Sequence, residues 1–182
     1  MKTAFALLLC VCSIQILLGQ NNDTAKTIKI GDEYQGGIVF FIYDLGEHGL
    51  IAAPYDQTSE KVMWGPKSKT GALYRNDGQS NTKMIVDYFS ANPKNLVKTA
   101  AYLCDTLTLG GYNDWYLPAI DELISMHNER QRIGDFLVGD YCSSTEQDNF
   151  NVYSVHFTTS RRIAFFYNKG DKDYFVRCIR KF

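Results

Sequence analysis

The sequence from Gly110 to Pro118 reads Gly-Gly-Tyr-Asn-Asp-Trp-Tyr-Leu-Pro, and it limits how this chain can fold. Adjacent glycines are typical of a helix end, because glycine readily adopts the conformation that closes the last turn. Pro118 suits the first turn of a new helix, where its missing N–H leaves no hydrogen bond unmade. Asp121 and Glu122 then complement the dipole of that helix. We therefore predict one helix ending before Gly110 and another beginning at Pro118.

Two helices are predicted before this point. Ser80 or Asn81 is suited to cap a short helix that runs through Phe89. A helix from about residue 96 would turn one apolar face to the core, formed by Leu96, Ala100, Leu103, Cys104 and Leu107. In the helix after Pro118, the side chains of Leu123 and Met126 would also point inward.

Segments typical of strands lie on both sides of these helices. Residues 36–43 are β-branched and aromatic, and a turn cluster leads from them into residues 50–54, which predicts a hairpin. Four more strands are predicted near the C-terminus, at Tyr141–Ser144, Val152–Phe157, Ile163–Tyr167 and Tyr174–Ile179. Turn residues at 168–172 predict a hairpin between the last two. Antiparallel strands at both ends around two to three central helices indicate an α+β fold.

The N-terminus is typical of an exported protein. Lys2 precedes an apolar run, Ala4 to Leu18, that is too short to span a membrane. We predict a cleaved signal peptide over residues 1–19, a polar leader over 20–30 and a single domain over 31–182. A buried N-terminal helix is the alternative, but the polar segment after it offers nothing to pack against. The expected location is secreted, periplasmic or at the cell surface.

Charge and chemistry narrow the range of functions. With 19 Lys and Arg against 20 Asp and Glu, interspersed, the chain has no basic surface for nucleic acid, and we expect no membrane insertion. His48, His127 and His156 lack the spacing of metal ligands, and Ser143 lacks the glycines of a nucleophile elbow. Asp121 and Glu122 point about 100° apart on a helix, so they do not flank one reacting atom. We expect no enzymatic activity and no required cofactor.

A longer pattern carries a family resemblance. Its segments follow one another in order, at Gly31–Phe40, His48–Pro54, Gly78–Thr82, Gly110–Trp115, Ser143–Glu146 and Val176–Arg180. In these segments the sequence resembles the secreted bacterial domains called Lcl C-terminal-like and the related Fibrobacter major paralogous domains. The resemblance covers nearly all of residues 31–182. It implies an extracellular C-type-lectin-like fold and a binding function, since some of these domains are adhesins for sulfated polysaccharides.

Three cysteines follow the predicted signal peptide. An exported protein meets an oxidising compartment, where pairs of cysteines form disulfides. The C-type lectin fold joins its first helix to its last strand, so the resemblance implies a disulfide between Cys104 and Cys178. Cys142 stands where relatives usually carry Trp, and we interpret it as a small buried hydrophobic residue, with a reactive thiol as the alternative.

The resemblance identifies no ligand-binding residue, so candidates come from residue chemistry. Residues 55–78 form a long loop of the kind that often binds ligands. Aromatic rings suited to stack on a sugar are those of Trp64, Tyr74 and Tyr112. An oxygen-rich cluster has the composition of a calcium site, with Glu146 and Asp148 as candidate ligands, and comprises Glu146, Asp148, Asn149 and Asn151. A solvated loop is its alternative.

The pair Arg161 and Arg162 is suited to hold a sulfate or carboxylate, or else belongs to an ordinary solvated hairpin. We expect a secreted, adhesin-like binding protein that recognises a polysaccharide or another cell-surface ligand through its loop face. The alternative is a structural or protein-interaction module without glycan binding. A contiguous apolar patch would favour a protein interface, whereas isolated aromatic residues beside carboxamides in a groove would favour a sugar.

Overall fold

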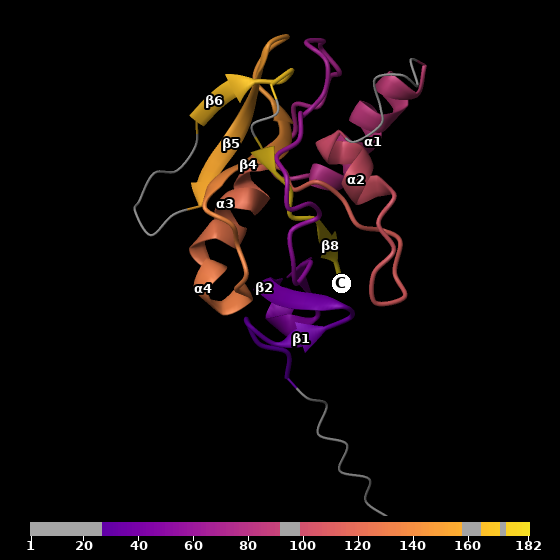
Figure 1. Cartoon of the computed structure of the whole chain (residues 1–182). Coiled ribbons are helices and arrows are strands. Elements are labelled where there is room, and N and C mark those ends of the chain that lie inside the picture. The colour runs from indigo at the N-terminus through magenta and orange to yellow at the C-terminus, as the bar shows by residue number, and fades with distance from the viewer. Residues whose placement is uncertain (1–26, 92–98, 158–164, 172–173) are drawn as a thin grey trace, which may run out of the picture.

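The computed structural model describes residues 27–91, 99–157, 165–171 and 174–182. These residues form two four-stranded sheets flanked by helices, which confirms the predicted α+β class (Figure 1). No helix among them is long and apolar enough to cross a membrane. The predicted signal peptide lies outside the described residues.

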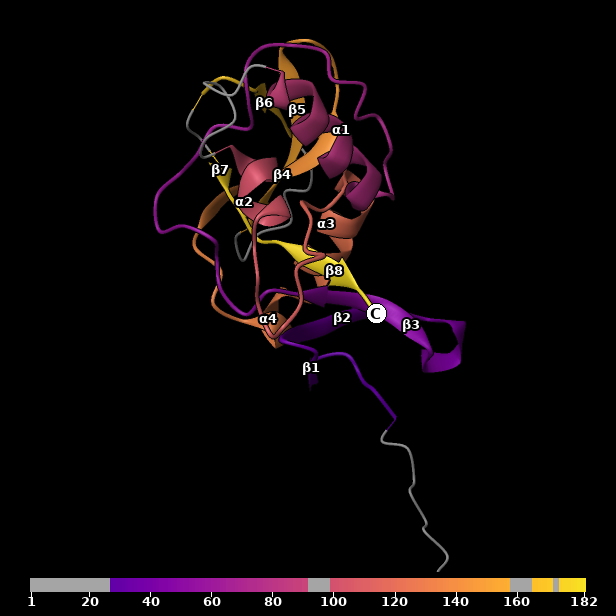
Figure 2. The same ribbon diagram turned by 90° about the vertical axis from the view of Figure 1, so that its right-hand side faces the viewer.

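The first sheet has the strand order β1-β2-β3-β8 and joins the two ends of the described chain. Its strands are β1 (Glu33–Tyr34), β2 (Gly37–Tyr43), β3 (His48–Ala52) and β8 (Ile179–Lys181). β2 and β3 form the predicted hairpin, with the short helix η1 (Asp44–Gly46) at its turn. β8 pairs antiparallel with β3, and Figure 2 shows it between that hairpin and the rest of the molecule.

The second sheet has the strand order β6-β5-β4-β7. Its strands are β4 (Gly139–Glu146), β5 (Asn151–Phe157), β6 (Phe165–Asn168) and β7 (Tyr174–Phe175). β4 and β6 both pair antiparallel with β5, whereas β7 runs parallel to β4. The predicted hairpin between the last two strands is therefore wrong, because β6 and β7 pair with different neighbours. The predicted antiparallel arrangement holds for the other strand pairs described, and the parallel pairing of β7 with β4 is its exception.

The predicted strand Tyr174–Ile179 is also wrong as one element, because β7 and β8 belong to different sheets. Between them, the chain bonds to the loop that follows β3. Val176 O accepts from Gln57 N–H at 2.9 Å, and Cys178 O accepts from Ala53 N–H at 2.9 Å. Because these distant N–H groups bond to the carbonyl oxygens of Val176 and Cys178, the strand is interrupted between β7 and β8.

Between β3 and β4, the described chain forms the helices α1 (Gly78–Ser90), α2 (Ala100–Asp105), α3 (Ile120–Asn128) and α4 (Arg130–Ile133). The cap of α1 is Asp77, whose carboxylate accepts from Ser80 N–H at 3.3 Å and Ser80 Oγ–H at 2.6 Å. The predicted caps Ser80 and Asn81 are therefore wrong by about one helical turn. Asn81 instead bonds its amide to the backbone of Tyr74, at 3.0 and 2.6 Å.

The α2 helix ends at Asp105, before the predicted stop at Gly110. Of its predicted core face, Ala100 and Cys104 are fully buried, and Leu103 and Leu107 pack against the same cluster at the edge. Leu96 lies outside the described residues. The core role of this face is thus confirmed, although the helix is shorter than predicted.

The α3 helix begins two residues after Pro118, so Pro118 is not in its first turn as predicted. Ser144 N–H donates to Pro118 O at 2.7 Å, which holds the proline in the segment bonded to β4. Asp121 and Glu122 do lie in the first turn, as predicted. Leu123 and Met126 point into the core with no exposed surface, also as predicted.

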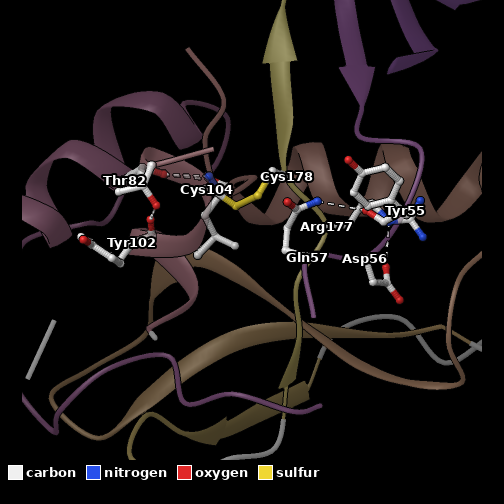
Figure 3. The surroundings of a disulfide bond; sticks show 10 residues. Tyr55, Asp56, Gln57, Thr82, Tyr102, Cys104, Arg177 and Cys178 are labelled. Carbon is white, nitrogen blue, oxygen red and sulfur yellow. Dashed lines mark hydrogen bonds and ion pairs between the residues drawn. A yellow bond between two sulfur atoms is a disulfide. The ribbon is translucent and has the colours of Figure 1, made fainter. Parts of the chain in front are cut away.

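The disulfide between Cys104 and Cys178 confirms the predicted pairing (Figure 3). It joins α2 to the segment between β7 and β8, with the Cα atoms 5.4 Å apart. Beside it, Arg177 Nε lies 2.7 Å from Asp56 Oδ1 and its Nη1 donates to Ala53 O at 3.0 Å. Loop, helix and C-terminal segment are therefore held together at one place.

Candidate functional site

The long loop predicted at residues 55–78 is present and connects β3 to α1. Its centre crosses the second sheet, where Val62 N–H donates to Tyr174 O at 2.8 Å. Trp64 follows and is fully buried, with its Nε1–H donating to Ser143 O at 2.9 Å. The predicted sugar-stacking role of Trp64 is therefore wrong. Its ring is a core side chain that anchors the loop.

Glu146, predicted to be a calcium ligand, is the buried anchor of the next part of the loop. Its carboxylate accepts from Thr70 N–H at 3.1 Å, Thr70 Oγ1 at 3.2 Å and Gly71 N–H at 2.7 Å. Lys169 Nζ lies 2.6 Å from the same carboxylate and also donates to Ser68 O at 2.8 Å. Burial alone would raise the pKa of Glu146, but these hydrogen bonds outweigh it and lower the pKa.

Because four donors already occupy its two oxygens, Glu146 is not available as a calcium ligand, and that prediction is wrong for this residue. Asp148 is likewise engaged, since it accepts from Phe150 N–H and Asn151 N–H at 2.7 Å each and from Asn151 Nδ2 at 3.0 Å. Among the described residues, no group of three or more His, Cys, Asp or Glu is placed to hold a metal. The geometry of the turn is that of a solvated loop.

A hollow of about 530 Å³ lies beside this anchor, where the long loop meets the turn between β4 and β5. We call it the loop hollow, and it is lined by Lys69, Leu73, Glu146, Gln147, Asp148, Asn149 and Phe150. Leu73 and Phe150 expose 54% and 58% of their surface, so two apolar side chains stand in a polar rim. Gln147 and Asn149, both exposed, add carboxamides to that rim.

The structure brings together only part of the predicted set. Asp148 and Asn149 line the loop hollow, and Tyr74, 51% exposed, directly follows the lining residue Leu73. Tyr112 lies elsewhere, with the guanidinium carbon of Arg180 3.9 Å from its ring centre, so one face of the ring is covered. The predicted ligands Arg161 and Arg162 lie outside the described residues.

Sequence reasoning missed Leu73, Phe150, Lys69 and Gln147. The available signal was a single Phe in the otherwise polar run Gln147-Asp-Asn-Phe-Asn151, because a strand-connecting turn of that composition has no core to bury a ring. For Lys69 and Leu73 the sequence held no signal, because their place depends on the contact between the loop and Glu146.

Within the described part of the chain, the three histidines lie in separate places. His48 is exposed at the β2–β3 hairpin, His156 Nδ1 lies 2.9 Å from Asp140 Oδ1, and His127 is buried against Phe157. The β4 thiol of Cys142 is 1% exposed, and burial raises its pKa. It matches the predicted small core residue, and its surroundings disfavour the reactive thiolate that was the alternative.

No protein-family model matches the sequence, and no curated protein sequence matches it. Among solved structures, the chain is similar to a fimbrial protein from Bacteroides ovatus, with 15% sequence identity and a TM-score of 0.48. The match covers 80% of this chain and 43% of the fimbrial protein, so the chain spans less than half the length of that protein.

Proposed function

We propose that this protein is a secreted or surface-exposed binding protein that has no enzymatic activity and recognises a carbohydrate through the loop hollow. The observation that carries the proposal is the pairing of exposed apolar side chains, Leu73 and Phe150, with the carboxamides of Gln147 and Asn149 around one concavity. A sugar ring has an apolar face and a rim of hydroxyls, so it matches both kinds of surface.

The rim is held in place by the buried pair of Glu146 and Lys169, which fixes residues 68–71 to the second sheet. A loop that is already ordered loses little conformational freedom when a ligand binds. The disulfide between Cys104 and Cys178 supports an oxidising location. With the sequence pattern, this pairing also supports our assignment of the chain to the Lcl C-terminal-like family and a C-type-lectin-like fold.

The test is a binding screen of the protein against neutral and sulfated polysaccharides, with calcium and then with a chelator. We expect binding that persists in the chelator, because the carboxylates of Glu146 and Asp148 are already engaged within the protein. Phe150→Ala should weaken it about tenfold, or 1.4 kcal/mol. Tyr88→Ala on α1, a comparably exposed aromatic residue, is the control and should have no effect.

Loss of binding in the chelator would instead place a calcium ion in the site and contradict the carboxylate argument. Equal effects of Phe150→Ala and Tyr88→Ala would contradict the location. Absence of binding to every polysaccharide would overturn the proposal in favour of a protein-interaction module that uses the same fold.

A further inference from the structure

A second hollow lies between β2 and the start of α3 and shares no lining residue with the loop hollow. Its volume is about 380 Å³, within the range of roughly 300–1,000 Å³ that is usual for small-molecule sites. We call it the β2–α3 groove, and it is lined by Phe41, Tyr43, Leu50, Asn76, Asp121, Glu122, Ser125 and Lys181.

One wall of the groove is aromatic because β2 contains an irregularity. The pairing with β3 shifts register between Val39 and Phe41. Phe40 is therefore buried in the core, whereas its neighbour Phe41 is 43% exposed. Tyr43, two residues further on, shares the face of Phe41 and is 41% exposed. Their ring centres lie 6.2 Å apart with planes inclined by 39°, so they form one shallow apolar wall.

The remaining lining residues are mainly polar. Asp121 Oδ1 accepts from Arg75 Nη2 at 2.9 Å, and Lys181 Nζ lies 3.4 Å from Asp77 Oδ1, so charges of both signs are balanced. Ser125 Oγ–H donates to Asp121 O at 2.9 Å, which leaves the hydroxyl oxygen able to accept. Asn76 is exposed, and its carboxamide makes no hydrogen bond among the described residues.

The polar side is also rigid. Glu122 Oε2 accepts from Gly78 N–H at 3.1 Å and from Ala119 N–H at 2.8 Å, and Oε1 accepts from Tyr116 Oη–H at 3.2 Å. This buried carboxyl therefore joins the starts of α1 and α3. Asn76 lies just before α1, and Asp121 and Ser125 lie on α3, so their positions are set before any ligand arrives.

We propose that the β2–α3 groove is a second saccharide site, specific for uncharged pyranose units. The rings of Phe41 and Tyr43 offer a stacking surface, and Asn76, Asp121 and Ser125 offer donors and acceptors for hydroxyl groups. Lys181, the one basic residue among the described residues that line the groove, is already paired with Asp77, so the groove offers no unpaired cation to a sulfate. The proposal rests on saccharide binding as the function of the protein but is independent of the loop hollow.

The test is a titration of the ¹⁵N-labelled full chain with neutral cello-, manno- and galacto-oligosaccharides, followed by amide NMR. We expect the amides of Tyr43, Leu50 and Ser125 to shift. Tyr43→Ala and Asn76→Ala, on opposite sides, should each weaken binding at least tenfold. Leu45→Ala is the matched control, because Leu45 lies fully exposed on the same hairpin but does not line the groove.

The outcomes separate the two sites. Shifts confined to residues 69–73 and 146–150, abolished by Phe150→Ala and insensitive to Tyr43→Ala, would overturn the groove and leave the loop hollow standing. The reverse pattern would support the groove and contradict the loop hollow. An equal loss in Leu45→Ala, or unmoved groove amides throughout the neutral series, would also overturn the proposal. Unchanged melting temperatures establish that each variant is folded.

Discussion

Replacing Lys169 with methionine should destabilise the protein strongly, because it removes the ammonium group that neutralises a buried carboxylate. The side chains of Lys169 and Glu146 are 0% and 1% exposed, and their charged atoms lie 2.6 Å apart. Methionine keeps an unbranched apolar side chain at this position but removes the ammonium, whose Nζ also lies 4.6 Å from the centre of the Trp64 ring. The substitution therefore tests the charge more than the packing.

Removal of one partner of a buried ion pair costs about 3–5 kcal/mol. For a chain of this size that corresponds to a fall in melting temperature of roughly 6–20 °C. The pKa of Glu146 gives a second expectation. Burial raises it and the hydrogen bonds from Lys169, Thr70 and Gly71 lower it, so without Lys169 the pKa should rise. Protonation then relieves the unpaired charge, and the deficit should shrink as the pH falls from 7 toward 4.5.

Urea denaturation with the disulfide intact, followed by tryptophan fluorescence at several pH values, measures both effects. Lys83→Met is the matched control, since Lys83 pairs with Asp87 on the surface, with 75% and 62% of the two side chains exposed. A pair of this kind contributes about 0.3–0.5 kcal/mol. If Lys169→Met is no more destabilising than Lys83→Met, or if its deficit widens in acid, then Lys169 does not stabilise the protein by neutralising Glu146.

Three further effects are measurable in the same denaturation assay. Cys104→Ser opens a disulfide that spans 74 residues and should lower the free energy of unfolding by about 4 kcal/mol; a change below about 1 kcal/mol would contradict this. Burial raises the pKa of Glu122 from 4.5 to about 7, so wild-type stability should fall by up to about 3 kcal/mol as the pH rises through this range, and Glu122→Gln should flatten that slope. Gly111→Ala should lower the free energy of unfolding by about 1–3 kcal/mol through backbone strain alone, because its Cβ would meet open space. Gly110→Ala should lower it by more, because its Cβ would also lie 2.4 Å from Gly36 Cα.

The parts of the fold that sequence predicted well are those set by nearby residues. The β2–β3 hairpin and the inward face of α3 follow from local alternation and helical spacing, and Leu123 and Met126 are buried as those patterns require. The break between β7 and β8 is different, because Gln57 and Ala53 bond to it from far along the chain. No local pattern around residues 174–179 distinguishes such a segment from a continuous strand.

At the candidate sites too, the sequence indicates the chemistry of a residue, whereas distant contacts decide whether that residue is accessible to a ligand. Glu146 has the right chemistry for calcium, but a lysine and two loop residues take its oxygens. Phe41 belongs to an apolar run that predicts burial on either face, and only the register shift with β3 turns it outward. Exposure, which decides whether an aromatic ring can bind a ligand, is therefore fixed by pairing across the sheet and not by the run itself.

The two hollows are supported by the same device, a buried carboxylate that accepts backbone N–H groups from separate segments. Glu146 holds Thr70 and Gly71 beside the loop hollow, and Glu122 holds Gly78 and Ala119 beside the β2–α3 groove. Such carboxylates are expensive to bury, and Glu146 and Glu122 are only 2% and 6% exposed. Both carboxylates hold irregular segments in place. This would favour the proposed binding of a sugar, because a surface that is already ordered loses less conformational entropy when a ligand binds.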